Sequence, residues 1–398
     1  MYGLRRFGIK LGLETIGKIL ETLGNPHKSF KCIHVAGTNG KGSIASALAS
    51  ILHASGYKTG LYTSPHLVRF NERICINNEP VSDEDVINSY EKVKKVQEKA
   101  DRGLTFFEYT TAMAFYEFGR QKVDWAVIET GMGGRLDATN IIEPSISIIS
   151  NLSIEHTTYL GNTIAQIAEE KGGIIKENTP VVTGVRQKNA VSILKKIAQD
   201  KSAPFYRFGE DFKVERTQEQ RFNYFGVENV WRDMQTGLQG SYQVDNAALV
   251  LAACEILGRS EADLPLQCIK DGLEQNKWPG RLEIVSTSPF VVIDGAHNLD
   301  AAKNLAKYLS ENLSDRKLTL VVGILDDKPY TAILQSLLPV CNRVIITQPK
   351  IDRSLLPEKL SLIAKEMVSD VKIISDVAEA VKYAIETSSP EDAVCIGG

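Results

Sequence analysis

The residues most capable of chemistry lie in a glycine-rich loop near the N-terminus. Lys41 sits between Gly40 and Gly42, after a β-branched apolar run at 31–36 and before a helical pattern at 43–55. Glycine lets backbone N–H groups converge on a phosphate, and the helix N-terminus adds partial positive charge. The lysine would neutralise terminal phosphates, and the following hydroxyl would bind Mg²⁺. The residues predicted to bind ATP are Gly37, Thr38, Asn39, Gly40, Lys41, Gly42 and Ser43.

The spacing of this loop departs from the common phosphate-loop form. Only two residues separate Gly37 from the Gly-Lys pair, and Gly42 is inserted before Ser43. The alternative is a tight strand-to-helix turn that needs glycine for closure only. Because lysine and serine are both in register, we favour the nucleotide loop.

Two further polar side chains follow candidate strands. Glu129 ends the run at 125–129, and His156 follows the run at 146–149. Carboxyl ends of parallel strands meet at one edge of a sheet, so both side chains are expected beside the phosphate loop. A carboxylate there suits Mg²⁺. A lone histidine is more often a structural hydrogen-bonding residue, and that alternative stays open for His156.

The amino-acid composition limits the classes to which the protein can belong. Of 398 residues, 43% are apolar and 24% charged, which fits a globular chain and excludes a collagen, a coiled coil or a disordered tail. The 46 basic and 49 acidic residues give a net charge of −3, so we expect no nucleic-acid partner. We also expect a monomer, since no exposed heptad pattern is present.

The cysteines and the hydropathy pattern indicate the compartment. Six scattered cysteines contain no Cys-x-x-Cys pair, which is typical of a reducing environment. Lys10 and Glu14 interrupt the N-terminal apolar stretch, so we expect no signal peptide. No run of 18 apolar residues is present to span a bilayer. We expect a cytoplasmic protein with no membrane association.

The pattern of elements predicts an α/β fold: an N-terminal P-loop ATPase domain with a mostly parallel sheet, and a smaller C-terminal Rossmann-like α/β domain. Pro279 and Gly280 mark the boundary, so the domains are 1–279 and 280–398. Residues 207–226 read as a short antiparallel excursion. Predicted strands span 31–36, 59–63, 125–129, 146–149, 180–183, 290–294, 318–323, 343–347, 371–374 and 393–396; predicted helices in the first domain span 43–55, 83–99 and 107–120.

Taken together, four motifs resemble the folylpolyglutamate synthase family of the Mur ligase superfamily. They occupy residues 34–43, 63–67, 129–140 and 294–298, in family order and over nearly the whole chain. The phosphate loop alone indicates the superfamily, whereas the second and third motifs favour the folate branch. The resemblance implies an ATP-dependent ligase that joins L-glutamate to a folate through an acyl phosphate.

The resemblance also assigns residues. It implies two Mg²⁺ ions, with Lys171 carrying a carbamate that supports the second ion. Lys41, His156 and Lys171 are then the catalytic residues. The implied metal ligands are Ser43, Ser64, Glu129, His156 and carbamylated Lys171; the further ATP contacts are Asn246, Arg281 and Asp294, with His297 and Asn298 in the same motif as Asp294.

The folate side is implied by two more segments. Aromatic rings suit a flat pterin, and a carboxylate can accept hydrogen bonds from its amino-pyrimidine edge. Ordinary core packing is the alternative for Phe106 and Phe107. The implied folate-binding residues are Thr105, Phe106, Phe107, Glu108, Arg135, Leu136 and Asp137, and residues 8–13 resemble the family's N-terminal stretch near the folate.

Several alternatives remain at this point. The substrate is dihydropteroate, a reduced folate or both, and we favour the bifunctional enzyme. A peptidoglycan ligase needs a UDP-binding domain, for which a phosphate loop starting at residue 37 leaves no room. A third hypothesis is a non-catalytic protein that uses ATP as a conformational switch. It would leave the presence of Glu129, His156, Lys171, Arg281 and Asp294 unexplained. The family usually extends further at both ends, so we expect a short gene product or a truncated chain. Domain closure is expected to bring Arg281 and Asp294 to the nucleotide.

Overall fold

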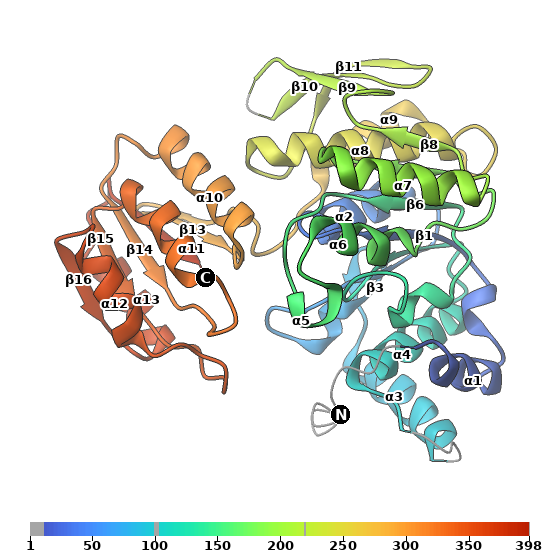
Figure 1. The fold of residues 1–398 in the computed structure, drawn as a ribbon, viewed down its shortest axis with the longest axis horizontal. Coiled ribbons are helices and arrows are strands. Elements are labelled where there is room, and N and C mark those ends of the chain that lie inside the picture. The colour runs from blue at the N-terminus through green and yellow to red at the C-terminus, as the bar shows by residue number, and fades with distance from the viewer. Residues whose placement is uncertain (1–11, 99–102, 219, 398) are drawn as a thin grey trace. The chain divides into compact units, whose positions relative to one another are not determined.

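The computed structural model describes residues 12–98, 103–218 and 220–397, and these form two compact units (Figure 1). The first unit consists of Met1–Gly237 with Gln243–Lys277, and the second of Leu238–Tyr242 with Trp278–Gly398. The Pro279-Gly280 segment predicted as the domain boundary lies just after Lys277. The short segment Leu238–Tyr242, which belongs to the second unit, was not predicted from sequence. Residues 8–11 of the predicted folate-proximal stretch lie outside the described residues.

The first unit is built on an eight-stranded sheet in the order β4-β3-β2-β5-β1-β6-β7-β8. In this order, the neighbouring strands β2-β5-β1-β6-β7-β8 all pair in parallel. At one edge, β3 pairs antiparallel with β2, and β4 pairs antiparallel with β3. The phosphate-loop strand β1 therefore lies between β5 and β6, which carry the other predicted site residues. The strands are β1 (Lys31–Ala36), β2 (Thr59–Tyr62), β3 (Ile74–Ile76), β4 (Glu79–Pro80), β5 (Trp125–Glu129), β6 (Ile146–Ile149), β7 (Val181–Thr183) and β8 (Phe205–Arg207).

Helices cover both faces of this sheet, as alternating side chains on buried strands require. On one face, Cys32 and Ala36 of β1 pack in two apolar clusters with α1 (Glu14–Thr22), α3 (Asp83–Gln97), α4 (Phe106–Gln121), α6 (Ile164–Gly172) and α7 (Lys188–Asp200). Helix α2 (Lys41–Ala54) packs on β1, β2 and β5, and α9 (Leu266–Gln275) packs on α2. Gly272 of α9 permits this contact, because a Cβ there would lie 2.6 Å from Ile51 Cα.

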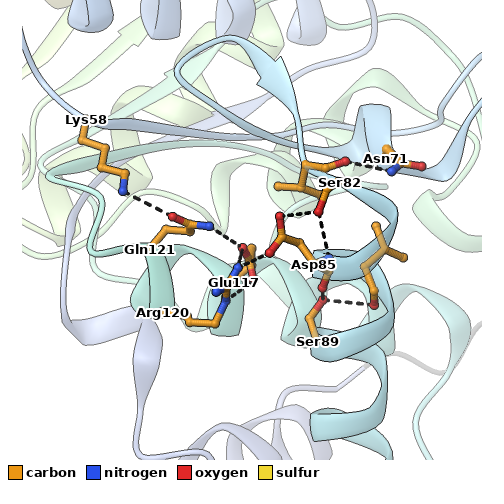
Figure 2. A network of polar contacts seen from close by, with 10 residues as sticks. Lys58, Asn71, Ser82, Asp85, Ser89, Glu117, Arg120 and Gln121 are labelled. Carbon is orange, nitrogen blue, oxygen red and sulfur yellow. Dashed lines mark hydrogen bonds and ion pairs between the residues drawn. The ribbon is translucent and has the colours of Figure 1, made fainter.

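A polar network joins α3 to α4 beneath the sheet (Figure 2). Arg120 pairs with Asp85 and, at 2.6 Å, with the fully buried Glu117. Gln121 donates to Glu117 at 3.1 Å and accepts from Lys58 Nζ at 3.3 Å. A buried carboxylate is stable only when its oxygens are satisfied, so this network fixes the C-terminal end of α4 against α3.

The antiparallel excursion is a separate three-stranded sheet that lies later in the chain than the sequence predicted. It contains β9 (Lys213–Arg216), β10 (Arg221–Phe225) and β11 (Val230–Gln235) in the order β11-β10-β9. It is fastened to α8 (Ser241–Leu257) by Glu255, whose carboxylate accepts from Tyr224 Oη at 2.9 Å and from the N–H groups of 227–229.

The second unit has a six-stranded sheet in the order β12-β13-β17-β14-β15-β16, parallel except for β12. Helices α10 (Leu299–Asn312), α11 (Tyr330–Leu337) and α12 (Pro357–Lys365) pack on one face, and α13 (Val377–Glu386) packs on the other. The strands are β12 (Glu283–Thr287), β13 (Phe290–Asp294), β14 (Leu318–Val322), β15 (Arg343–Ile346), β16 (Asp370–Ile373) and β17 (Ala393–Gly397).

The predicted fold class is confirmed in both units. In the part of the chain that is described, none of the helices is both long and apolar enough to cross a membrane.

Candidate functional site

The phosphate loop is hydrogen-bonded to the segment that follows β6. Thr38 N donates to Asn151 O at 2.9 Å, and Ser150 Oγ donates to Asn39 O at 2.6 Å. Gly37 has φ +144°, and a Cβ there would lie 1.8 Å from Ser150 Oγ. The loop therefore requires glycine at 37 because the end of β6 occupies the space of a side chain.

Two lysines converge on the same carbonyl of this loop. Lys41 Nζ donates to Gly37 O and Thr38 O, each at 3.0 Å. Lys171 Nζ, from the end of α6, donates to Gly37 O at 2.6 Å and to Glu155 Oε1 at 2.9 Å. The structure thus brings together two predicted catalytic residues that are 130 positions apart in sequence.

Lys171 is almost completely buried, with 1% of its surface exposed. Burial lowers its pKa to about 8, and the attraction of Glu155 acts in the opposite direction. Burial also opposes ionisation of Glu155, but the nearby Lys171 and Lys41 hold the pKa of that carboxyl below its usual range. Sequence reasoning missed Glu155 as the partner of Lys171, although it directly precedes the predicted ligand His156.

The predicted metal ligands come from separate strand ends and loops. Glu129 ends β5, lies opposite Val35 of β1 in the ladder, and accepts from Ser64 N at 3.1 Å. The structure therefore brings Glu129 and Ser64 together beside the phosphate-loop strand. Ser43, in the first turn of α2, is buried, and its Oγ accepts from Gln243 at 3.3 Å.

His156 opens the short helix α5 (Thr157–Leu160) in a left-handed backbone conformation, with φ 48°. Its neighbour Glu155 faces Lys171, so the segment 155–156 lies next to the phosphate loop. The role of the His156 ring as a metal ligand stays a prediction.

Helix α8 supplies a second set of polar groups to the loop. A Cβ on Gly40, where φ is +84°, would lie 2.6 Å from Asn246 Oδ1. Asn246 Nδ2 in turn donates to Gln243 Oε1 at 2.8 Å. Asn246 is therefore beside the phosphate loop, as a nucleotide contact requires. Gln243 is a neighbour of Ser43 that the sequence did not single out.

The glycine-rich loop after β5 packs tightly against the C-terminal end of α6. A Cβ on Gly134 would lie 2.8 Å from Glu170 O, and one on Gly173 would lie 2.4 Å from Arg135 Cα. Arg135 N donates to Glu170 O at 2.7 Å, and its exposed guanidinium pairs with Glu170 at 2.7 Å. These glycines permit backbone contact between the Arg135 segment and the helix that carries Lys171.

The predicted folate-side carboxylates are both engaged with their own backbone. Glu108 Oε2 accepts from Thr105 N at 2.8 Å, while Thr105 Oγ1 accepts from Glu108 N at 3.2 Å; this reciprocal capping box starts α4. Glu108 Oε1 is buried with no hydrogen-bond partner among the described residues. Asp137 accepts from Met132 N at 2.9 Å and from Thr139 N and Oγ1 at 3.0 and 2.5 Å.

The two predicted aromatic residues have different surroundings. The Phe107 ring packs against Tyr62 and against Gly131, where a Cβ would lie 2.4 Å from the ring. The Phe106 ring has the guanidinium of Arg73 at 5.3 Å from its centre, and Arg73 Nε donates to His66 Nδ1 at 2.7 Å. Both rings are half-buried, as is Leu136. Their contact with a folate stays a prediction.

Arg281 and Asp294 belong to the second unit. Asp294 accepts from Leu282 N at 2.9 Å, and a Cβ on Gly295 would lie 2.3 Å from Arg281 Nη1. Burial raises the pKa of Asp294, and the charge of Arg281 acts against that rise. Asn298 caps α10 through Ala301 N at 3.0 Å, and His297 Nδ1 lies 2.8 Å from Gly295 O. That Arg281 and Asp294 contact ATP stays a prediction.

Strand, phosphate loop and helix, with a carboxylate on the adjacent strand, define a nucleotide-binding α/β enzyme class. Two family models match the chain: the Mur ligase middle domain over residues 35–254 and the Mur ligase, glutamate ligase domain over 280–398.

Individual relatives agree with these models. The dihydrofolate synthase/folylpolyglutamate synthase of Bacillus subtilis is 34% identical, covering 100% of this chain and 94% of its own. The folylpolyglutamate synthase structure from Thermotoga maritima is 39% identical with a TM-score of 0.89, covering 100% and 92%. Escherichia coli FolC in complex with DHPP and ADP is 30% identical with a TM-score of 0.92, covering 100% and 93%.

The chain belongs to the folylpolyglutamate synthase/dihydrofolate synthase family of the Mur ligase superfamily. The family resemblance found in the sequence is confirmed.

Proposed function

We propose that this chain is an ATP-dependent ligase that joins L-glutamate to folates, acting on both dihydropteroate and reduced folates. The observation that carries the proposal is the convergence of Lys41 and Lys171 on Gly37 O in a phosphate loop beside Glu129. Related enzymes named for both activities support the two substrates.

The reaction needs activation of a carboxylate. A carboxylate oxygen of the folate attacks the γ-phosphorus of ATP, and ADP leaves. The amine of L-glutamate then attacks the acyl carbonyl, phosphate departs as the C–O bond breaks, and the amine proton passes to solvent. No protein nucleophile is needed, so this chain's contribution is to orient the reactants and to stabilise charge. Lys41 is placed to do this at the terminal phosphates.

The residues present fit a hard divalent cation. Among the described residues no group of three or more His, Cys, Asp or Glu side chains could hold a metal. Mg²⁺ typically uses one or two carboxylates and completes its shell with water and substrate phosphates. Glu129, with Ser64 and Ser43, supplies such a sparse oxygen set. When bound, Mg²⁺ would offset charge on the phosphates. Mg²⁺ as the physiological ion, and a second ion at Lys171, are part of the proposal.

A carbamate on Lys171 is consistent with its burial. The neutral amine is the form that attacks CO₂, and burial lowers the pKa of Lys171 to about 8. Carbamylation would replace a cation with an anion next to Glu155, so we expect the Lys171–Glu155 pair to separate when it forms.

On the folate side, the structure favours Glu108 over Asp137 as the direct acceptor from the pterin. Glu108 retains one carboxylate oxygen without a hydrogen-bond partner among the described residues, whereas each oxygen of Asp137 already accepts at least one bond. Phe106 and Phe107 would contribute flat apolar surface.

The remaining partners follow from this assignment. The substrates are ATP, L-glutamate and a folate or dihydropteroate, and we propose a monomeric enzyme. All six cysteines are free thiols, which favours a reducing compartment such as the cytoplasm.

Product mass spectrometry tests the proposal. The protein receives ATP, Mg²⁺ and L-glutamate, with dihydropteroate in one tube and tetrahydrofolate in another. Addition of glutamate in both tubes is expected. Addition in one tube identifies a single-activity synthase, and addition in neither contradicts the assignment. Lys41→Ala is the negative control, and the surface variant Lys196→Ala is its matched positive control.

A further inference from the structure

His34 is a buried histidine that the phosphate loop itself does not require. It lies in β1, two residues before Ala36, and has 0% of its surface exposed. Its side chain alternates with Val35 and so lies on the same sheet face as Cys32, toward α4 and the short 3₁₀ helix Ala138–Ile141. A polar ring at such a position is expensive unless it is hydrogen-bonded.

The ring is hydrogen-bonded to one residue of that 3₁₀ helix. His34 Nε2 lies 2.8 Å from Thr139 Oγ1, and Thr139 Oγ1 donates to Asp137 Oδ1 at 2.5 Å. A hydroxyl has a single proton, which Thr139 uses on the carboxylate. It must therefore accept from His34, so Nε2 carries the proton.

The other ring nitrogen agrees with this assignment. His34 Nδ1 is buried with no hydrogen-bond partner among the described residues. If Nε2 carries the proton, Nδ1 is an unprotonated acceptor that lacks a donor. This is less unusual than the other tautomer, in which Nδ1 would be a buried N–H group without an acceptor. Burial lowers the pKa of His34 to about 3, so the ring is neutral at ordinary pH.

Asp137, at the far end of this chain of bonds, organises the loop that follows Glu129. Its carboxylate accepts from Met132 N at 2.9 Å and from Thr139 N at 3.0 Å, so the loop folds around it. Asp137 N also donates to Gly134 O at 3.1 Å. The same loop carries Arg135 and Leu136, which are predicted to bind the folate.

We propose that His34 is a positioning residue for the folate side of the reaction, acting through Thr139 on Asp137 and the loop at 130–137. The inference rests on the proposed function for its kinetic consequence. The hydrogen-bond relay His34–Thr139–Asp137 connects the phosphate-loop strand to the folate-binding loop. It explains why a histidine, rather than an apolar residue, precedes the glycine-rich loop on a buried strand face.

The first test does not depend on activity. Nitrogen-15 NMR of histidine-labelled protein distinguishes the two neutral tautomers, and His34→Gln assigns the signal by its loss. We expect His34 to be neutral with the proton on Nε2 at pH 7. A proton on Nδ1, or a charged ring, would overturn the relay.

The second test compares matched variants in the ligase assay. Thr139→Val removes the hydroxyl with little change of shape, and Thr139→Ser retains it. Likewise His34→Leu removes the donor, and His34→Gln offers an N–H in its place. Thr139→Val loses a hydrogen bond to the Asp137 carboxylate and should raise KM for dihydropteroate about tenfold. His34→Leu loses a bond to the neutral Thr139 hydroxyl and should raise the same KM in the same direction but by less. KM for ATP should stay within about twofold, and Thr139→Ser and His34→Gln should recover most of the loss.

The outcomes are separable. If KM for ATP rises as much as KM for dihydropteroate, or if Thr139→Val lowers only the melting temperature, His34 is a purely structural residue and the inference is wrong. If wild-type protein ligates no glutamate, the proposed function fails, and the tautomer measurement still decides whether the relay exists.

Discussion

The phosphate loop and the folate-side segments use their polar side chains in opposite ways. At the phosphate loop, the amine of Lys41 contacts the backbone carbonyls of Gly37 and Thr38, partners that a phosphate oxygen can replace. On the folate side, Thr105 and Asp137 accept backbone N–H groups of their own segments.

This difference distinguishes residues that contact a reactant from residues that stabilise the loop that contacts the reactant. A lysine that contacts loop carbonyls, such as Lys41, can exchange partners with little cost to the fold. A carboxylate that caps its own loop cannot leave without orphaning buried N–H groups. At the phosphate loop and on the folate side, residue type indicates equally well which chemistry is possible. Whether a side chain can contact a reactant depends on whether it already accepts hydrogen bonds from its own backbone.

The largest expected effect on activity is at the phosphate loop. Lys41→Ala should reduce kcat/KM by about 10²–10³-fold, because a charge at the γ-phosphate is lost. The melting temperature should change little, since the hydrogen bonds of Lys41 go to two loop carbonyls. Initial-rate assays and thermal unfolding, with Lys196→Ala as control, measure both. An unfolded or fully active Lys41→Ala protein would contradict the claim that Lys41 serves the reactant and not the fold.

A matched pair of carboxyl-to-amide changes tests the contrast directly. Glu129→Gln should lower activity about 10²-fold or more and raise the Mg²⁺ concentration needed, with little loss of stability. Asp137→Asn places an NH₂ group among N–H donors and should lower the free energy of unfolding by about 2–4 kcal/mol. Urea unfolding and a metal titration of each variant distinguish the two. If Asp137→Asn lost activity and Glu129→Gln lost stability instead, Asp137 would be the carboxylate that serves the reaction.

Glycine substitutions separate backbone strain from the nucleotide contact. Gly40 and Gly56 have φ of +84° and +91°, but only a Cβ on Gly40 meets a neighbour, Asn246 Oδ1 at 2.6 Å. Both alanine variants should lose about 1–2 kcal/mol of stability from the left-handed backbone. Only Gly40→Ala should also raise KM for ATP, by about tenfold. Equal KM values would remove Asn246 from the nucleotide site.

The last expected effect is on stability and not on activity: a pH dependence from the folate-side relay. Burial lowers the pKa of His34 to about 3, below its unfolded value of 6.5. Between these values the unfolded chain binds a proton that the folded chain does not, so stability falls as the pH falls below 6.5. From pH 7 to pH 5, wild type should lose about 2 kcal/mol more than His34→Gln in urea unfolding. A constant difference would contradict a neutral buried ring.

The fold could be predicted well wherever a strand is buried on both faces. The bounds of β1, β5 and β6 follow from short, mostly apolar runs that contain β-branched residues, and the structure confirms them. The antiparallel sheet of β9–β11 was placed too early because its strands alternate polar and apolar residues and depend on a distant anchor, Glu255. Such an anchor leaves no local signal in the sequence.

The site was predictable in its residue types and less so in its contacts. The phosphate loop and Glu129 follow from elementary chemistry, and Lys171 required the family resemblance. The pairing of Lys171 with Glu155, and of Thr139 with His34, depends on which strand ends lie together. The S/T-x-x-E spacing of Thr105 and Glu108 was visible as a capping box, so that local role could have been found.

The central claim is that the folate carboxylate is activated by direct phosphorylation at the phosphate loop. Dihydropteroate with ¹⁸O in its carboxylate tests this claim in one turnover with ATP and L-glutamate. The account predicts that one ¹⁸O atom per amide formed appears in inorganic phosphate, because the attacking oxygen leaves with the phosphoryl group. Label in AMP, or amide formation with unlabelled phosphate, would contradict it.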